Sequence, residues 1–343
     1  MKLHKGKLYP IIALLALCLI LTACSLGTQP GPENNKNTGA GLAIELTGAD
    51  GTSTKLTLAD LEKMPAVTGK GSFKKSTGTI EGPFEYKGVK LRELLNRAGA
   101  ADQNGIEVVA SDGYSMTYTA EQIDGEVMTY DSDGQAQKPG GTTAVLAYEM
   151  DGQKDFEGIP RIVFLAEENV ITDGHLWARD VQTIKVLPEI KDWVITLKGI
   201  EEAKMDRATY ESAATCPDTQ HPAQTYEFTG KEGKTSVYEG IPLWVLISMI
   251  DGADPQLGHY RFNDDLARKG YKIKVISKDG YSVELESQLV ARNSNIIAAY
   301  KKDGSYLPPD EFPLTMTGAD LPSKKYMVKQ IAEIQLIELP NQQ

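Results

Sequence analysis

The chain has 343 residues, with 36 Lys and Arg against 47 Asp and Glu, so its formal net charge at pH 7 is -11. This acidity, without any basic cluster, argues against nucleic acid or an anionic membrane surface as a partner. Three cysteines are too few for a disulfide framework, so we expect apolar cores to stabilise the fold.

The N-terminal residues 1–23 predict an export signal. Three lysines precede an uncharged run at residues 11–21, which is too short for a permanent membrane span. The sequence LTAC, which ends at Cys24, follows directly and resembles the bacterial lipoprotein signal, in which the cysteine is lipidated and becomes the mature N-terminus. We therefore expect a lipoprotein anchored through Cys24 to the extracytoplasmic face of the cell membrane; the alternative is an ordinary secretory signal with a chance cysteine.

Residues 24–41 are typical of a flexible tether. They are rich in Gly, Pro, Asn, Gln and Thr and show no apolar periodicity. Loss of the signal removes three lysines, so the formal charge of the mature chain is -14. The folded part is expected to begin near Leu42.

A pattern of aromatic, glycine and apolar residues occurs twice, 152 residues apart. The paired positions are Tyr86 and Tyr238, Gly88 and Gly240, Val89 and Ile241, Leu91 and Leu243, Leu94 and Leu246, Leu95 and Ile247, and Ala98 and Ile250. In each copy a glycine turn is expected to lead into a helix, since apolar residues at i, i+3, i+4 and i+7 form one buried stripe. A repeated pattern of this length indicates a repeated domain.

Each copy also predicts a β-hairpin downstream. Apolar residues alternate on both sides of Asp-Gly pairs in residues 106–118 and 273–285, which favours type I′ turns. The two hairpins are 167 residues apart, because the second copy has an extra polar stretch around residues 257–272. An extra loop at residues 124–141 of the first copy returns the offset to 152 for the segments that follow. The closing strands, residues 184–188 and 336–340, keep that offset.

The repeat predicts two tandem domains, residues 42–189 and 190–343. Each has about 150 residues, which is enough for a core of its own. The boundary should lie between Pro188 and Trp193.

Both predicted domains resemble the molybdopterin-binding domain of the sulfite oxidase superfamily. In the first, the resemblance is carried by Leu56-Thr57-Leu58 with Leu61 and Met64-Pro65, by residues 86–95 and 106–118, by Gly158-Ile159-Pro160-Arg161 and by residues 177–184. In the second, it is carried by residues 238–247, 279–285, 312–314 and 324–334. The resemblance implies an α+β fold and, in active members, molybdenum held by a pterin dithiolene and one cysteine thiolate.

Active members carry the cysteine upstream of the Gly-x-x-Leu segment, usually before a Gly-Asn pair. The first domain has no cysteine in residues 67–79, whereas the second has Cys216, which Pro217 follows. A thiolate suits molybdenum because it is a soft ligand. The resemblance therefore makes Cys216 the candidate metal ligand.

Relatives also bind the pterin phosphate through basic side chains. Arg161 fits the first of these positions in the first domain, and Arg179 or Lys185 could fill the second. The second domain has Thr315 where the arginine is expected, and its remaining candidates are Lys324, Lys325 and Lys329. The candidate metal ligand and the best candidate phosphate anchor therefore belong to different domains.

Cys216 has other interpretations. With His221 it could bind zinc or form a nucleophile pair, but a metal site needs three or four ligands, and His175 or His259 could complete one only through the fold. A loop cysteine without any chemistry also remains possible.

Two functional hypotheses follow. The first is a degenerate, cofactor-free pair of domains that binds a small ligand or a protein partner. The second is a molybdopterin-dependent oxidoreductase with Cys216 as metal ligand. The export signal favours the first, because it lacks the arginines of the twin-arginine pathway, which exports folded, cofactor-loaded proteins.

Overall fold

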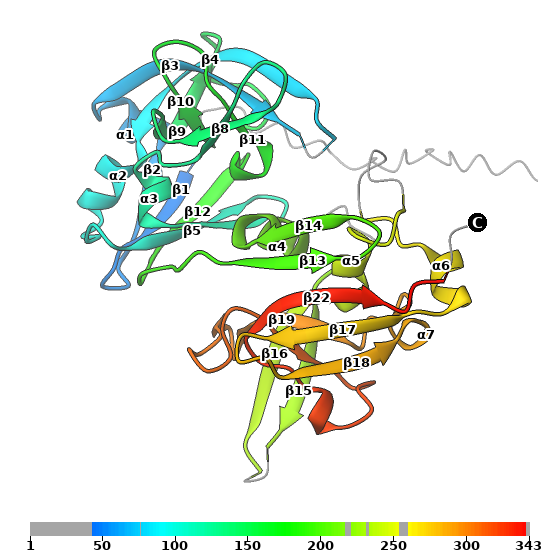
Figure 1. Cartoon of the computed structure of the whole chain (residues 1–343). Helices are drawn as coiled ribbons and strands as arrows, with labels where there is room; N and C mark the ends of the chain where they lie inside the picture. Colours follow the sequence, from blue (N-terminus) through cyan, green and yellow to red (C-terminus); the bar gives the residue numbers. More distant parts are fainter. Residues whose placement is uncertain (1–42, 76, 217–220, 231–232, 254–259, 341–343) are drawn as a thin grey trace, which may run out of the picture. The chain divides into compact units, whose positions relative to one another are not determined.

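The computed structural model describes residues 43–75, 77–216, 221–230, 233–253 and 260–340. The predicted signal, Cys24, the tether and Pro217 lie outside these residues. Residues 37–343 form one compact unit. Its described part is rich in β-strands arranged in mixed sheets, with few and short helices (Figure 1). None of the described helices has the length and apolar character needed to cross a membrane.

The first sheet brings together strands from both ends of the predicted first domain. Its order is β2 (Ser53–Thr57), β1 (Ala43–Thr47), β12 (Val181–Leu187), β5 (Gly105–Ala110) and β6 (Ser115–Tyr118). β1 and β12 are parallel and the other neighbours antiparallel. Helix α1 (Leu58–Glu62) follows β2 and begins at a capping box, in which Thr57 and Asp60 bond each other's backbone N–H groups.

The second sheet has seven strands. Its order is β10 (Arg161–Leu165), β9 (Thr143–Met150), β4 (Ile80–Lys90), β3 (Ala66–Lys74), β11 (Ile171–Asp173), β7 (Met128–Tyr130) and β8 (Ala136–Pro139). The associated helices are α2 (Leu91–Arg97), α3 (Ala120–Ile123) and the 3-10 helix η1 (Gly174–Leu176). The predicted extra loop at residues 124–141 therefore contributes strands β7 and β8 to this sheet.

Two further sheets lie in residues 194–337. The third has the order β14 (Glu202–Asp206), β13 (Val194–Lys198), β22 (Ile331–Ile337), β17 (Lys272–Ser277) and β18 (Ser282–Glu286), with β13 and β22 parallel (Figure 1). The fourth has the order β15 (Gln224–Thr229), β16 (Thr235–Pro242), β19 (Ile297–Lys302) and β20 (Ser305–Tyr306), and β21 (Thr315–Thr317) also pairs with β19. The helices here are α4 (Arg207–Thr215), α5 (Leu243–Ile247), α6 (Asp264–Lys269), α7 (Ser287–Val290) and the 3-10 helix η3 (Lys324–Tyr326).

The apolar stripes of the two predicted helices are buried, as expected. Leu91, Leu94 and Leu95 of α2 have no exposed surface, and neither have the corresponding apolar residues of α5. One large core cluster is built from residues 44–186 and also includes Ala208 of α4, while a second spans residues 193–336. Helix α4 thus contributes to the packing of both regions.

The glycine turn expected before each helix is wrong. Gly88 lies inside β4 and Gly240 inside β16, each at a shift in the register with the neighbouring strand. A Cβ atom at either position would come within 2.2 Å of a backbone oxygen, that of Leu146 or of Ala298. Glycine is needed there because another strand passes close by, not because a turn requires it.

Both predicted hairpins are confirmed, but the predicted turn type is wrong. β5 pairs with β6, and β17 with β18. Gly113 and Gly280 have φ of +89° and +88°, whereas the aspartate before each glycine does not have positive φ. A type I′ turn needs positive φ at both central residues, so each connection is a longer loop that closes with one left-handed glycine.

The extra polar stretch at residues 257–272 is described only in part. Residues 260–272 include α6, which begins at an Asn263 side-chain cap and ends before Gly270, whose φ is +91°.

Candidate functional site

Arg161, the predicted anion anchor of the first domain, is the first residue of β10 and is only 5% exposed. Its Nε donates to the Gly158 backbone oxygen at 2.9 Å, and its Nη1 to the Tyr86 hydroxyl at 3.1 Å. Burial lowers the pKa of Arg161 and raises the pKa of Tyr86. A side chain on Gly158 would collide with the guanidinium, since a Cβ atom there would be 2.5 Å from Nη2.

Arg179 lies close to Arg161 but on the surface. Its guanidinium is 5.6 Å from the centre of the Phe73 ring. Burial is the largest cause of the lowered pKa of Arg161, and the like charge of Arg179 lowers this pKa further. The structure therefore brings these two predicted site residues together, as a buried and an exposed cation.

The corresponding tyrosine of the second region, Tyr238, contacts both an anion and a cation, since Lys302 Nζ lies 5.0 Å from the centre of its ring. Its hydroxyl donates to Glu311 Oε2 at 2.9 Å. Glu311 is 3% exposed, and its Oε1 lies 2.9 Å from Lys302 Nζ and 3.0 Å from Lys329 Nζ. Lys329 also pairs with Asp310 at 3.1 Å, so this predicted anchor is already bound to two carboxylates.

The buried carboxylate is held in its charged form. Burial alone would raise the pKa of Glu311, but hydrogen bonds from Lys302, Lys329 and Tyr238 outweigh it, and the pKa is lowered. The Tyr86 hydroxyl thus accepts from a guanidinium, whereas the Tyr238 hydroxyl donates to a carboxylate that is itself paired with lysines.

Lys324 and Lys325 are both exposed, on η3. Lys324 Nζ donates to the Thr229 backbone oxygen at 3.2 Å and lies 4.7 Å from the centre of the Phe228 ring. The backbone oxygen of Lys325 accepts a hydrogen bond from Tyr281. These contacts fix η3 beside the end of β15 and the β17–β18 hairpin.

Cys216 caps the C-terminus of α4 and is a half-buried free thiol. Burial is the main cause of the raised pKa of Tyr114 and of the pKa of about 12 for Tyr260, and the nearby Cys216 adds to both shifts. Cys216 therefore lies near two phenols. The ring of Tyr260 also packs edge-on against His221, with ring centres 4.8 Å apart.

Of the predicted cofactor-binding residues, Arg161 and Arg179 lie close to each other. Among the described residues, no contact is found between Cys216 and the cationic groups of Arg161, Arg179, Lys325 or Lys329. No group of three His, Cys, Asp or Glu side chains in the described part of the chain is arranged to hold a metal ion.

A buried polar cluster around Arg207 and Glu211 was not predicted from the sequence. Arg207 and Glu211 of α4, 1% and 3% exposed, form an ion pair of 3.1 Å. Thr117 of β6 donates to Glu211 Oε2 at 2.6 Å and accepts from Arg207 through its backbone oxygen at 3.0 Å. The Tyr306 hydroxyl donates to the other oxygen of Glu211 at 2.5 Å. An Arg and a Glu four residues apart on one helix were the only signal for it.

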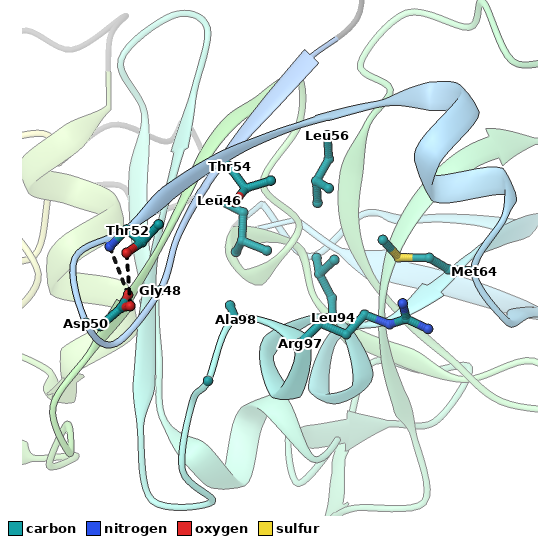
Figure 2. A pocket seen from close by; sticks show the side chains of 11 residues that line it. Leu46, Gly48, Asp50, Thr52, Thr54, Leu56, Met64, Leu94, Arg97 and Ala98 are labelled. Carbon is teal, nitrogen blue, oxygen red and sulfur yellow. Dashed lines mark hydrogen bonds between the residues drawn. The ribbon is translucent and has the colours of Figure 1, made fainter.

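A groove of about 560 Å³ lies between the β1–β2 hairpin and α2. Figure 2 shows Leu46 and Leu56 of the hairpin and Leu94 of α2 pointing toward one another across it. At the turn of the hairpin, the Asp50 carboxylate accepts two hydrogen bonds of 2.9 Å from Thr52. None of the predicted site residues lines this groove.

The Glu311 cluster predicts a pH-dependent stability. Replacing Glu311 with Gln should lower the free energy of unfolding at pH 7 by about 1–3 kcal/mol, because Lys302 and Lys329 lose their buried anion. The folded-state pKa of Glu311 lies below its ordinary value of 4.5, so its contribution is present above that pH and is lost as the pH falls through the folded-state value.

The difference between parent and Glu311→Gln should therefore shrink as the pH falls below about 4.5. Urea unfolding between pH 3 and 7 would measure it, with exposed Glu227→Gln as the control. A difference that stays constant across this range would contradict the assignment.

Comparison with known proteins found similarity to solved structures only. No family model matches the chain, and no curated protein matches it. The sulfane dehydrogenase SoxCD from Paracoccus pantotrophus aligns with 11% sequence identity and a TM-score of 0.35, covering 88% of this chain and 79% of that chain. A likeness at this TM-score establishes neither the fold nor a function for this chain.

Proposed function

We propose that this protein is an extracytoplasmic lipoprotein whose folded part derives from the molybdopterin-binding oxidoreductase fold and acts as a binding module for a small ligand or a protein partner. The tether would hold the module near the membrane through lipid on Cys24. The proposal rests on site residues rather than on fold, because one fold serves many functions.

We infer that residues 42–189 and 190–343 are copies of one α+β domain. The orders β2-β1-β12-β5-β6 and β14-β13-β22-β17-β18 support this, since each has its one parallel pair at the same position. The register also supports it: Gly88 is opposite Ala147, and Gly240 is opposite Ala299. Both pairs keep the offset of 152 seen in the sequence.

The observation that carries the proposal is the buried carboxylate that the second copy has beside its tyrosine, where the first copy has a buried guanidinium. In the first copy Tyr86 contacts Arg161, a cation suited to a phosphate group. In the second copy Tyr238 contacts Glu311, which would repel a phosphate and occupies Lys302 and Lys329.

The residues do not fit a molybdopterin group in either copy. The copy with the cationic pair has no cysteine, and the copy with Cys216 has a buried carboxylate where an anion would bind. A thiolate ligand is favoured by nearby cations, whereas the groups near Cys216 are the phenols of Tyr114 and Tyr260. Neither copy therefore offers this cofactor both a thiolate ligand and a cationic site for its phosphate.

The test is metal content and activity of the protein purified from its native membrane. We expect molybdenum well below one equivalent, and no change in metal content or dye-linked reductase activity in Cys216→Ser. About one equivalent of molybdenum, lost together with activity in Cys216→Ser, would establish the alternative, a molybdopterin-dependent oxidoreductase with Cys216 as metal ligand. Ser212→Ala, on the same helix, is a matched control.

The membrane anchor has its own test. Cys24→Ala should leave the protein unprocessed or release it from the membrane fraction, because no residue remains to receive the lipid. Fractionation followed by N-terminal sequencing would measure this. Cys18→Ala, inside the predicted signal core, should behave like the parent. If Cys24→Ala is still cut after Ala23 and stays with the membrane, the lipoprotein assignment is wrong.

A further inference from the structure

A cavity of about 570 Å³ lies beside the segment that connects β12 to β13. That segment lines it together with α3, β7, η1 and the start of α4. The lining includes buried apolar side chains, among them Val127, Leu176, Ile190 and Trp193. None of the residues described above as contacts of Arg161 or Glu311 lines this cavity. The one link to Cys216 is His175, which lines the cavity and whose backbone oxygen accepts a hydrogen bond from Tyr114, the phenol near Cys216.

The charged side chains of this cavity are nearly all acidic. Lys191 is the one Lys or Arg in the lining, and the carboxylates are Glu121, Glu126, Asp173, Glu189, Asp192 and Asp206. The three aspartates have partners: Asp173 accepts from the Tyr130 hydroxyl, Asp192 pairs with Arg207, and Asp206 caps α4. The three glutamates are exposed, and within the described residues their carboxylates make no hydrogen bond or ion pair.

An indole N–H donor in the cavity wall is also available. Trp193 is 7% exposed, and its ring packs against Tyr210 with ring centres 5.6 Å apart. None of the described residues accepts a hydrogen bond from its Nε1–H. Donors in such buried side chains are ordinarily satisfied by protein, water or ligand. A ligand in this cavity would therefore find a donor as well as anions.

The rim of the cavity carries exposed apolar surface. Met128 and Val194, 37% and 58% exposed, both line it. Few large apolar side chains are this exposed in the described part of the chain, and the others are Phe156, Val237 and Tyr281. Apolar side chains left exposed around a concave surface are typical of a contact with a partner.

We propose that this cavity binds an extended basic segment of a partner polypeptide. Lys or Arg side chains of the partner pair with Glu121, Glu126 and Glu189, and a backbone carbonyl accepts from the Trp193 N–H. Apolar side chains between the basic residues cover Met128 and Val194. A peptide suits the cavity better than a metal ion or a simple diamine, because neither of these carries both the acceptor and the apolar groups. This proposal goes beyond the proposed function and holds whether or not Cys216 binds a metal.

The experiment uses the full-length lipoprotein in detergent, titrated by calorimetry with the acetylated, amidated peptide Lys-Leu-Lys-Leu. The cavity variant combines Glu121→Gln, Glu126→Gln and Glu189→Gln. The control combines Glu45→Gln, Glu167→Gln and Glu168→Gln, three exposed carboxylates outside the cavity. We expect the cavity variant to bind the peptide about tenfold more weakly, as the loss of three exposed ion pairs predicts, and the control to bind it like the parent.

Two further comparisons separate peptide recognition from charge alone. Trp193→Phe keeps an aromatic ring but removes the N–H, so it should weaken peptide binding. Because Trp193 is buried, Trp244→Phe, a second buried Trp outside the cavity, is the control for the loss of volume and should bind the peptide like the parent. Diaminopentane and Mg²⁺ at the same concentration should not displace the peptide. Equal weakening in the cavity and control variants, or displacement by diaminopentane or Mg²⁺, would overturn the proposal.

Discussion

Replacing Arg207 with Ala is expected to lower the free energy of unfolding by about 3–5 kcal/mol, the usual cost of leaving one half of a buried ion pair without its partner. Arg207 is 1% exposed, and its removal would leave Glu211 buried without its cationic partner. Burial alone would lower the pKa of Arg207, but Glu211 and Asp192 outweigh it and the pKa is raised. The pair therefore depends on both members.

Denaturant unfolding followed by circular dichroism would measure the effect. The informative control is Arg207→Met combined with Glu211→Leu, which removes both charges and keeps the volume filled. We expect this double variant to recover most of the loss, because replacing a complete buried pair by apolar side chains is often neutral. A loss below about 1 kcal/mol in Arg207→Ala would show that the cluster is not closed to water in solution.

Truncation of the paired core leucines, Leu91→Ala and Leu243→Ala, is expected to cost about 2–5 kcal/mol each. Both side chains have no exposed surface, and each is the first residue of its helix, α2 or α5. The cost combines the lost transfer free energy with the cavity that remains, so it depends on how far the surroundings relax.

The same unfolding measurement applies, with Val237→Ala as the control. Val237 is 38% exposed, so its truncation should change stability by no more than about 0.5 kcal/mol. If either leucine variant behaves like this control, the side chain does not belong to a closed core. A loss in one variant only would also count against equivalent roles for the two positions.

Local periodicity predicted much of the β-structure and the buried helix faces correctly. The hairpins β5–β6 and β17–β18, like the stripe of α2, follow from residues close in sequence, which a pattern of period 2 or 3.6 reports directly. The role of Gly88 could not be predicted, because the Leu146 oxygen that excludes a side chain there belongs to β9. The predicted turn type was wrong because a dipeptide such as Asp112-Gly113 does not set the length of the loop that contains it.

The candidate site was less predictable than the fold. Arg161 could be singled out by its position after Ile159-Pro160, but its Tyr86 partner is 75 residues away. Glu311 was not predicted as a site residue, since nothing near it in sequence indicates that it lies beside Tyr238. Charged groups act on each other over a few ångströms, so electrostatic roles depend on contacts between distant segments.

The sequence by itself determined the repeat pattern with its offset of 152 and the acidic charge, because each is a property of residue order or composition. The export signal stays a prediction from the same residue order. Only the tertiary structure decided that Arg207 and Glu211 are buried against Thr117, and that carboxylates of four separate segments line one cavity. Burial and charge proximity arise when strands and helices pack, and packing joins residues that are tens to hundreds of positions apart.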